Sequence, residues 1–244
     1  MTPKISRSLV QNVELLRSLT DEELDATLAA AQVCRMVEGE AAFRQGEPAD
    51  SFFILLSGHL KVVQLTPAGE QVVVRYVSPG DIFGIAQAMH RPNYPASAIA
   101  VQESLMLAWP GKEWNSLVSK HPQFAAGAFQ TVGQRLQDAH SRISALSTEE
   151  VEQRVARTIL RLIDESGETT EEGVAIGFPI TRQDIAEMTG TTLHTVSRLL
   201  SAWKDKGIVI SGRKRITVQS LNDLIRLAED GRTSDTPSTT KAGR

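Results

Sequence analysis

The spacing of apolar residues changes along the chain, and each spacing predicts a different kind of element. Between Val33 and Trp109, short alternating or apolar runs are broken by a glycine about every ten residues. Short strands that end in turns at such intervals are typical of a small antiparallel barrel or sandwich. A helix should precede this region, because Thr20 and Glu23 have the spacing of a capping box. The N-terminal part is therefore predicted to be a β domain behind a short helix.

One segment interrupts the strand pattern. Residues 82–89 have the composition of a short helix, and residues 90–95, which include two prolines, predict a loop. The N-terminus of a helix beside a β-barrel is a favourable place for a small ligand, since backbone N–H groups point outward there. This segment is therefore the predicted ligand niche.

A different spacing begins at Pro122. Apolar residues recur at intervals of three and four as far as residue 146, which predicts one long helix with a heptad seam. The seam consists of Phe129, Val132, Leu136, Ala139, Ile143 and Leu146. So narrow a stripe usually pairs with a copy of itself, so we expect a homodimer; packing on its own β domain is the alternative. Ser147 and Glu150 then match a capping box, which predicts a hinge before the next helix.

After a polar loop predicted at residues 165–173, the chain has the pattern of a helix-turn-helix. Thr181 and Asp184 form a capping-box start, Gly190 can end the first helix because glycine tolerates φ > 0, and Thr192 can cap a second helix. The apolar face of the second helix consists of Val196, Leu199, Leu200 and Trp203. Two short helices joined at a glycine are the motif whose second helix enters the DNA major groove.

Charge supports a nucleic-acid partner for this stretch. Residues 208–210 and 216–218 predict two strands joined by a basic hairpin tip, the wing of such a domain. From His194 to Val218, six Lys and Arg residues oppose one Asp, an excess of +5 in a chain whose net charge is −3. Phosphate contacts need a local basic surface of this kind. A helical hairpin with a solvated basic face is the alternative.

Composition indicates an ordinary globular protein, since 41% of the residues are apolar and 23% are charged. The single cysteine, Cys34, excludes a disulfide within the chain and a four-cysteine cluster, and we expect it to be a buried thiol. No apolar run is long enough to span a membrane and no signal peptide is evident, which indicates a cytoplasmic protein without a membrane partner.

Four divisions of the chain are predicted from these patterns. Residues 1–111 form the sensing β domain with its helices, residues 112–146 the dimerisation helix, and residues 147–230 the DNA-binding domain. Residues 231–244 are rich in Thr, Ser, Pro and Gly and are expected to be a disordered tail.

This order of parts resembles the Crp/Fnr family of bacterial transcription regulators from about residue 12 to residue 228. The most specific segments are 43–47 (FRQGE), 56–62 (LSGHLKV), 79–84 (PGDIFG) and 195–198 (TVSR). The resemblance implies an α+β fold: an N-terminal antiparallel β-roll (a cyclic-nucleotide-binding-like jelly roll), a long dimerisation helix and a C-terminal winged helix-turn-helix. It also implies a regulator that binds a palindromic operator in double-stranded DNA and, if it is an activator, RNA polymerase.

In that family, the position of Arg198 reads guanine, and the position of His194 often carries a glutamate that reads a base. Arg198 matches this pattern, and a bidentate arginine–guanine contact is worth about 1–3 kcal/mol. His194 departs from it, so the usual half-site need not apply, and His194 could instead contact phosphate. Leu193 is expected near a thymine methyl group. The predicted DNA contacts are Arg182, Thr191, Thr192, Leu193, His194, Thr195, Ser197, Arg198, Lys204, Arg213, Lys214 and Arg215.

The predicted effector pocket departs from the cyclic-nucleotide pattern of the family. Ile85 stands where those members carry a glutamate, Ser97 lacks the arginine that precedes its counterpart, and Arg91 lies too early in the loop to replace it. A cyclic phosphate needs a bidentate cation in a dry niche, so cyclic AMP is not expected to bind. A cyclic-nucleotide-responsive regulator is the alternative. The predicted pocket consists of Gly84, Ile85, Ala86, His90, Tyr94 and Ser97.

Segments 65–70 and 92–96 are similar to the Dnr and NnrR branch of the family, which responds to nitrogen oxides and is thought to use haem. Nitric oxide sensed through haem is therefore the predicted signal, while the lack of an N-terminal cysteine cluster argues against an iron–sulfur cofactor. A haem needs an axial His, Met, Cys or Tyr. The best candidate is His90, whose other interpretation is a solvated loop residue. The remaining candidates are His59, Met89 and Cys34.

The other histidines are expected on the surface. They are His59, which alternates with an apolar neighbour, and His121 and His140 beside or on the long helix. A β-barrel metalloenzyme with an accessory DNA domain is the remote alternative. It would need clustered histidines, and the five histidines of this chain are scattered without a His-x-His motif. We therefore expect neither a metal site nor an enzyme.

Overall fold

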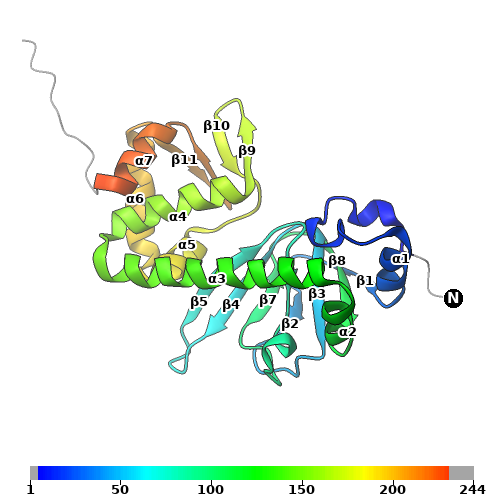
Figure 1. Cartoon of the computed structure of the whole chain (residues 1–244). Helices are drawn as coiled ribbons and strands as arrows, with labels where there is room; N and C mark the ends of the chain where they lie inside the picture. The colour runs from blue at the N-terminus through cyan, green and yellow to red at the C-terminus, as the bar shows by residue number, and fades with distance from the viewer. Residues whose placement is uncertain (1–4, 231–244) are drawn as a thin grey trace, which may run out of the picture.

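Two antiparallel sheets of four strands each form the N-terminal domain, so the predicted β-roll is confirmed (Figure 1). The computed structural model describes residues 5–230, and the predicted tail at 231–244 lies outside this part. In spatial order, the first sheet consists of β1 (Gln32–Met36), β8 (Ser104–Pro110), β3 (Ser51–Ser57) and β6 (Ile82–Phe83). The second sheet consists of β2 (Ala41–Phe43), β7 (Ser97–Ala100), β4 (Leu60–Leu65) and β5 (Gln71–Val77).

Aromatic side chains fill much of the interior of the roll. Phe43 stacks on Tyr94 with ring centroids 3.8 Å apart, and Phe53 stacks on Phe83 at 5.1 Å. Leu60, at the start of β4, is fully buried in the same cluster. Alternation along each strand turns one set of side chains inward, and the burial of such large apolar groups stabilises the roll by about 25 cal/mol per Å².

The helix predicted at residues 82–89 is wrong. Ile82 and Phe83 form β6, which pairs with β3, and only a short 3₁₀ helix, η3 (Gln87–Met89), follows. Both side chains of β6 are buried, and Gly84, which comes next, has a φ of 70°. An α-helix cannot continue through that value of φ. Burial against β3 therefore outweighed the weak helical composition.

Short helices surround one end of the roll. They are η1 (Arg7–Val10), η2 (Glu14–Leu16) and α1 (Asp21–Ala29) before the strands, and α2 (Glu113–Lys120) after them. The predicted capping box of α1 is confirmed: the Thr20 backbone N–H donates to the Glu23 carboxylate at 2.8 Å, and the Thr20 hydroxyl accepts the Glu23 N–H in return. Apolar residues of these helices, such as Leu16 and Leu28, pack in one cluster with strand residues of the first sheet.

A long helix of 27 residues, α3 (Pro122–Thr148), runs across the β domain and reaches the C-terminal domain, as predicted (Figure 1). The capping box predicted at Ser147 is wrong, because Ser147 lies inside α3 and its hydroxyl donates one turn back along the helix. The next helix, α4 (Val151–Ser166), is capped instead by Glu150 with Gln153. Neither α3 nor any other helix in the described residues is long and apolar enough to cross a membrane.

The C-terminal domain contains the predicted helix-turn-helix and wing. After α4 its helices are α5 (Arg182–Thr189), α6 (Leu193–Asp205) and α7 (Leu221–Asp230). Its sheet has the order β11 (Val209–Gly212), β12 (Arg215–Val218), β10 (Gly173–Ile176) and β9 (Gly167–Thr170). The hairpin β9–β10 replaces the loop predicted at residues 165–173. It forms because Val174 of β10 pairs with Val218 of β12, a neighbour distant in sequence that no local pattern reveals.

Gly58, in the turn between β3 and β4, and Gly39 have nearly the same φ, but their surroundings predict different losses of stability on substitution by alanine. A Cβ at Gly58 would collide with Ser104 and lie 2.5 Å from the Glu103 carbonyl oxygen, whereas one at Gly39 would meet nothing within 4 Å. We expect Gly39→Ala to lower the free energy of unfolding by about 1 kcal/mol, through backbone strain alone. Gly58→Ala should cost about 3 kcal/mol or more. Urea unfolding followed by circular dichroism measures both, and equal losses would contradict the packing described.

Candidate nucleic-acid interface and effector region

Two helix caps shape the helix-turn-helix. At the start of α5, the Thr181 hydroxyl accepts the Asp184 backbone N–H at 3.0 Å, and the Asp184 carboxylate accepts the Thr181 N–H at 2.9 Å. Gly190 ends α5 with a φ of 62°, a left-handed value that side chains disfavour. Thr192 then caps α6 by accepting the Thr195 N–H at 3.2 Å. The caps predicted from the sequence are confirmed, and they determine where α5 ends and α6 begins.

The inner face of α6 is anchored in the core of the domain. Val196 and Leu200 are fully buried, and Trp203 is 1% exposed, while Leu199 packs at the edge of the same cluster. The Trp203 indole N–H also donates to the Glu152 carboxylate of α4 at 2.8 Å. Because the inner face is held in this way, α6 presents its opposite face to solvent in one orientation.

The outer face of α6 carries the predicted base-reading residues. Leu193, His194 and Arg198 are exposed, and Ser197 is half-buried. Within residues 5–230, no ion pair or hydrogen bond engages the Arg198 side chain, so its guanidinium is available to a ligand. Seven predicted contacts lie in the loop between α5 and α6 and in the first two turns of α6. They are Thr191, Thr192, Leu193, His194, Thr195, Ser197 and Arg198.

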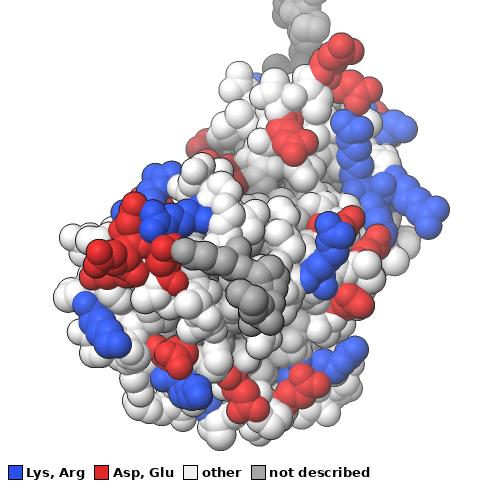
Figure 2. Space-filling view, turned by 90° about the vertical axis from the view of Figure 1, so that its right-hand side faces the viewer, with Lys and Arg blue, Asp and Glu red and all other residues white. Residues whose placement is uncertain are grey.

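The wing extends the basic surface beyond α6. The half-buried Arg182 of α5 donates to the Ser211 hydroxyl of β11 at 3.1 Å, which ties the helix-turn-helix to the wing. Arg213 and Arg215 at the hairpin tip are exposed, as is Lys204 in the last turn of α6. Figure 2 shows Lys and Arg side chains gathered along one edge of the upper half of the molecule, the half that contains the C-terminal domain in Figure 1.

The DNA-binding domain is docked on the β-roll in this conformation. The Asp184 carboxylate, besides capping α5, accepts the Lys61 ammonium of β4 at 2.7 Å. At the wing tip, Lys214 forms an ion pair with Glu38 of the β1–β2 turn. Lys214, a predicted phosphate contact, is therefore paired with the sensing domain although its side chain remains partly exposed.

His59 is buried in this domain interface, so its predicted surface position is wrong. Only 8% of the residue is exposed, and its ring stacks on that of Phe178 in the C-terminal domain, with ring centroids 4.5 Å apart. The ring of Tyr76 also packs on Phe178. Burial lowers the pKa of His59 to about 4, against the weaker opposing effect of the Asp81 carboxylate. The alternation of His59 with its apolar neighbour Leu60 did not reveal this, because part of the apolar surface that covers His59 comes from the other domain.

Two further single-residue predictions need correction. The His121 side chain is only 12% exposed and lies 3.3 Å from the Glu23 carboxylate, whereas His140 is exposed as predicted. Cys34 is half-exposed rather than fully buried, and its partial burial raises the pKa of the thiol. Among residues 5–230, no group of three or more His, Cys, Asp or Glu side chains could hold a metal ion.

The predicted effector niche inside the roll is filled by the protein's own side chains. Ile85, Ala86 and Tyr94 are buried, and the Tyr94 hydroxyl donates to a backbone carbonyl of β3 at 2.6 Å. A Cβ at Gly84 would lie 2.7 Å from the ring of Phe53. Little room is therefore left for a ligand beside Gly84.

The polar members of that niche do not converge on a cavity. His90 is exposed at the end of η3 with a left-handed φ of 54°, and the Ser97 hydroxyl accepts the Gln45 backbone N–H at 2.9 Å. Two pockets stand out in the described part of the chain, and none of the six predicted niche residues lines either of them. The six effector-site residues stay a prediction, and neither of these two pockets contains them.

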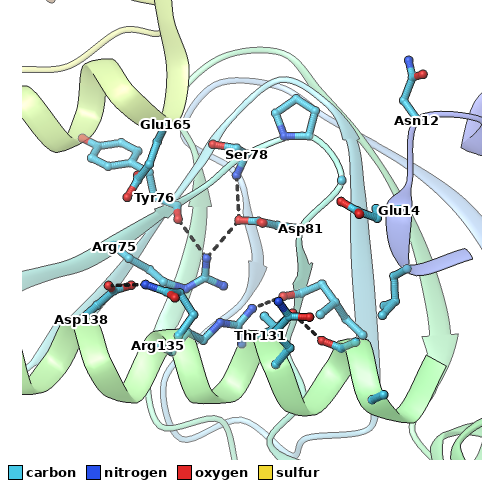
Figure 3. A pocket seen from close by; sticks show the side chains of 18 of the residues that line it. Asn12, Glu14, Arg75, Tyr76, Ser78, Asp81, Thr131, Arg135, Asp138 and Glu165 are labelled. Carbon is cyan, nitrogen blue, oxygen red and sulfur yellow. Dashed lines mark hydrogen bonds and ion pairs between the residues drawn. The ribbon is translucent and has the colours of Figure 1, made fainter. Parts of the chain in front are cut away.

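The larger of these pockets was not predicted from the sequence. It has a volume of about 870 Å³ and is lined by Arg75 of β5 and Arg135 of α3 among other polar residues (Figure 3). In the sequence, Arg135 appears only as a polar flank of the apolar seam, and Arg75 as one residue of a strand. Their proximity arises from the packing of α3 on the roll, which neither local pattern encodes.

Two family models match this chain. The model of the cyclic nucleotide-binding domain matches residues 33–121, and that of the Crp-like helix-turn-helix domain matches residues 153–227. Together they cover more than half of the chain. The chain therefore belongs to the Crp/Fnr family of DNA-binding transcription regulators, as the resemblance implied. Its place in the Dnr and NnrR branch stays a prediction.

Relatives and solved structures agree with this family. The cyclic AMP receptor protein of Thermus thermophilus is 27% identical over 205 residues, which are 84% of this chain and 92% of the relative. The transcriptional activator protein Anr of Pseudomonas aeruginosa is 25% identical over 86% of both chains. The structure of FixK2 from Bradyrhizobium japonicum has a TM-score of 0.71 at 23% identity, over 81% of this chain and 96% of that one, and so shares the fold.

The burial of His59 predicts a pH-dependent stability. Its pKa is about 4 in the folded protein, below the ordinary 6.5, so its contribution is complete above pH 6.5 and is lost as the pH falls from 6.5 towards 4. In that window the free energy of unfolding should fall by up to about 1.4 kcal/mol per pH unit. His59→Phe keeps the ring stack and should flatten the profile, whereas His140→Phe should not. Urea unfolding from pH 7 to pH 4 measures this, and identical slopes in all three proteins would contradict it.

Proposed function

We propose that this Crp/Fnr-type regulator acts as a homodimer that binds a palindromic operator and that a small effector at the β-roll controls this binding. The observation that carries the proposal is the exposed apolar seam of α3 together with the exposed, unpaired Arg198 on α6. Two copies joined along α3 would present two recognition helices, and operators of this type have half-sites about 34 Å apart.

The exposure of the seam supports a second copy of this chain as its partner. Phe129 is 74% exposed, Ile143 63% and Leu136 57%, although a helix that packed on its own β domain would bury these side chains. Leu146 is 49% exposed, Ala139 is exposed and Val132 is half-buried. A regular apolar stripe left in water is unfavourable, and the same stripe on a second α3 would cover it in heptad register.

The contacts between the domains suggest how an effector would act. Docking on the β-roll engages α5 through Lys61 and the wing tip through Glu38. A ligand that binds one arrangement of the roll and α3 more tightly than another would shift the population of docked DNA-binding domains. Lys214 would then exchange Glu38 for a DNA phosphate. Contact with RNA polymerase, expected if the protein is an activator, stays a prediction.

Neither cyclic AMP nor haem is well supported as that effector. One relative is named for cyclic AMP, but in this chain Ile85 is buried and Ser97 already accepts a backbone N–H. Haem and nitric oxide stay predictions from resemblance. His90 lies exposed outside the filled interior of the roll, and neither described pocket includes it, so its surroundings do not fit a haem.

Arg198 is the substitution that tests DNA recognition. A duplex selected from a random library serves as the operator. Arg198→Ala should weaken binding to it about tenfold to a hundredfold, because a bidentate guanine contact is worth about 1–3 kcal/mol. Arg226→Ala, on the exposed surface of α7, is the matched control and should bind as the wild type does. Gel-shift titration at a stated salt concentration measures both, and an unchanged affinity of the Arg198 variant would refute the assigned role.

The dimer has its own test. The double substitution Leu136→Asp with Ile143→Asp places charges on the seam and should convert the protein to a monomer, with loss of operator affinity. Gln137→Asp with His140→Asp adds the same charges to exposed positions of α3 beside the seam and should leave the dimer intact. Sedimentation equilibrium distinguishes the two outcomes. A seam variant that still sediments as a dimer would show that other surfaces hold the copies together.

A further inference from the structure

An open pocket of about 870 Å³ lies where the β-roll, the long helix and the N-terminal segment meet. Its walls come from η2, from the segment that links β5 to β6, and from one flank of α3 (Figure 3). Small-molecule sites in proteins occupy about 300–1,000 Å³, so the pocket has the size of a metabolite site. It is separate from the filled interior of the roll.

Two guanidinium groups lie close together in the middle of this pocket (Figure 3). Arg75 donates to the Tyr76 carbonyl at 2.9 Å and lies 3.3 Å from the Asp81 carboxylate. Arg135 donates to the Ile82 carbonyl, and among the described residues no carboxylate forms an ion pair with it. The Arg135 guanidinium is thus held by a backbone carbonyl and has no carboxylate in direct contact among the described residues.

Among the charged neighbours of Arg135, Arg75 has the largest effect on its pKa. Burial and the nearby charge of Arg75 lower the pKa of Arg135 to about 9, and the Asp81 carboxylate opposes this shift more weakly than Arg75 causes it. Arg135 is still protonated at pH 7, so two like charges face each other in a partly buried place. An oxyanion between them would relieve this repulsion and accept charge-assisted hydrogen bonds from both.

The acidic residues of the pocket lie around this pair rather than between its members. Glu14 is exposed at one edge of the pocket, where water and salt screen its charge, and Glu165 lies at the opposite edge (Figure 3). Partial burial raises the pKa of the Glu165 carboxyl group and so disfavours its charged form. Asp138 is already engaged, since it accepts the Gln134 side-chain amide at 3.1 Å. Such a rim disfavours a polyanion and favours a ligand with a single oxyanion group.

The rest of the wall is suited to a polar ligand body. The Thr131 hydroxyl donates to the Gly127 carbonyl at 3.0 Å, which leaves its oxygen free to accept a hydrogen bond from a ligand. Gln130 and Asn12 line the same pocket and are exposed to it, so amide donors and acceptors are also within the site. Leu15 and Ala126 add apolar surface to part of the wall.

We propose that this pocket binds a small organic anion whose phosphate or carboxylate group sits between Arg75 and Arg135 and whose polar body faces Thr131 and Gln130. This proposal rests on the proposed function, because it makes the anion the effector of the regulator. Arg135 directly precedes Leu136 of the seam, and Arg75 directly precedes Tyr76, which packs on Phe178 of the DNA-binding domain. A ligand that bridges the two arginines therefore connects the dimer helix with the domain interface.

Isothermal titration of the full-length protein tests the site with three probes: inorganic phosphate, adenosine 5′-monophosphate and lactate. The phosphate and carboxylate arms distinguish the two kinds of oxyanion. We expect at least one probe to bind and Arg135→Gln to weaken its binding at least tenfold, because the amide lacks the charge and the second N–H pair. Arg44→Gln removes an exposed arginine of the roll and should leave the affinity unchanged.

Arg135→Lys keeps the charge without the planar fork, so it should bind with intermediate affinity, and it serves if the glutamine variant fails to fold. Absence of heat with all three probes at millimolar concentration would overturn the proposal, as would equal binding by wild type and both Arg135 variants. Gel shifts on the same samples distinguish a failure of the anion site from a failure of the DNA-binding function. A protein that binds the selected duplex but no probe refutes the anion site alone, whereas one that binds a probe but no duplex refutes the DNA-binding function alone.

Discussion

One buried carboxylate joins the two halves of this protein. Asp184 is 4% exposed; it caps α5 through Thr181 and accepts the Lys61 ammonium of the β-roll at 2.7 Å. Burial by itself would raise the pKa of Asp184, but the hydrogen bonds from Lys61 and Thr181 outweigh this effect and lower it. The carboxylate is therefore charged at neutral pH, and removing a partner from such a buried charge costs about 3–5 kcal/mol. The same carboxylate thus caps the first helix of the helix-turn-helix and holds this motif against the β-roll.

Docking constrains the DNA-binding parts unequally. The outer face of α6 is exposed, while the wing tip is tied to the roll by the ion pair of Lys214 with Glu38. Both charges of this pair are partly exposed, so the pair is weak and depends on salt, unlike the buried contact at Asp184. The wing can therefore be released at lower cost than α5. Regulation that begins with the wing needs only a small difference in ligand affinity between the two arrangements.

The interior of the β-roll is packed with side chains of the protein itself. The backbone of this domain is shared with relatives named for cyclic AMP, but its cavity depends on which side chains fill the space between the sheets. Here Tyr94, stacked on Phe43, occupies that space, and Gly84 is in close contact with Phe53. Open volume remains instead outside the roll, beside α3. The proposed anion site therefore lies at that junction rather than between the sheets.

Local spacing determined the elements whose causes are local. The caps at Thr181 and Thr192, the glycine turn at Gly190 and the heptad seam of α3 all depend on residues three or four positions apart, so the sequence alone predicts them. Tertiary structure alone decided the burial of His59 beneath Phe178, the pairing of β10 with β12, and the meeting of Arg75 with Arg135. In each of these cases the deciding neighbour is far away in the chain, and such a neighbour leaves no periodic trace in the sequence around the residue that it covers.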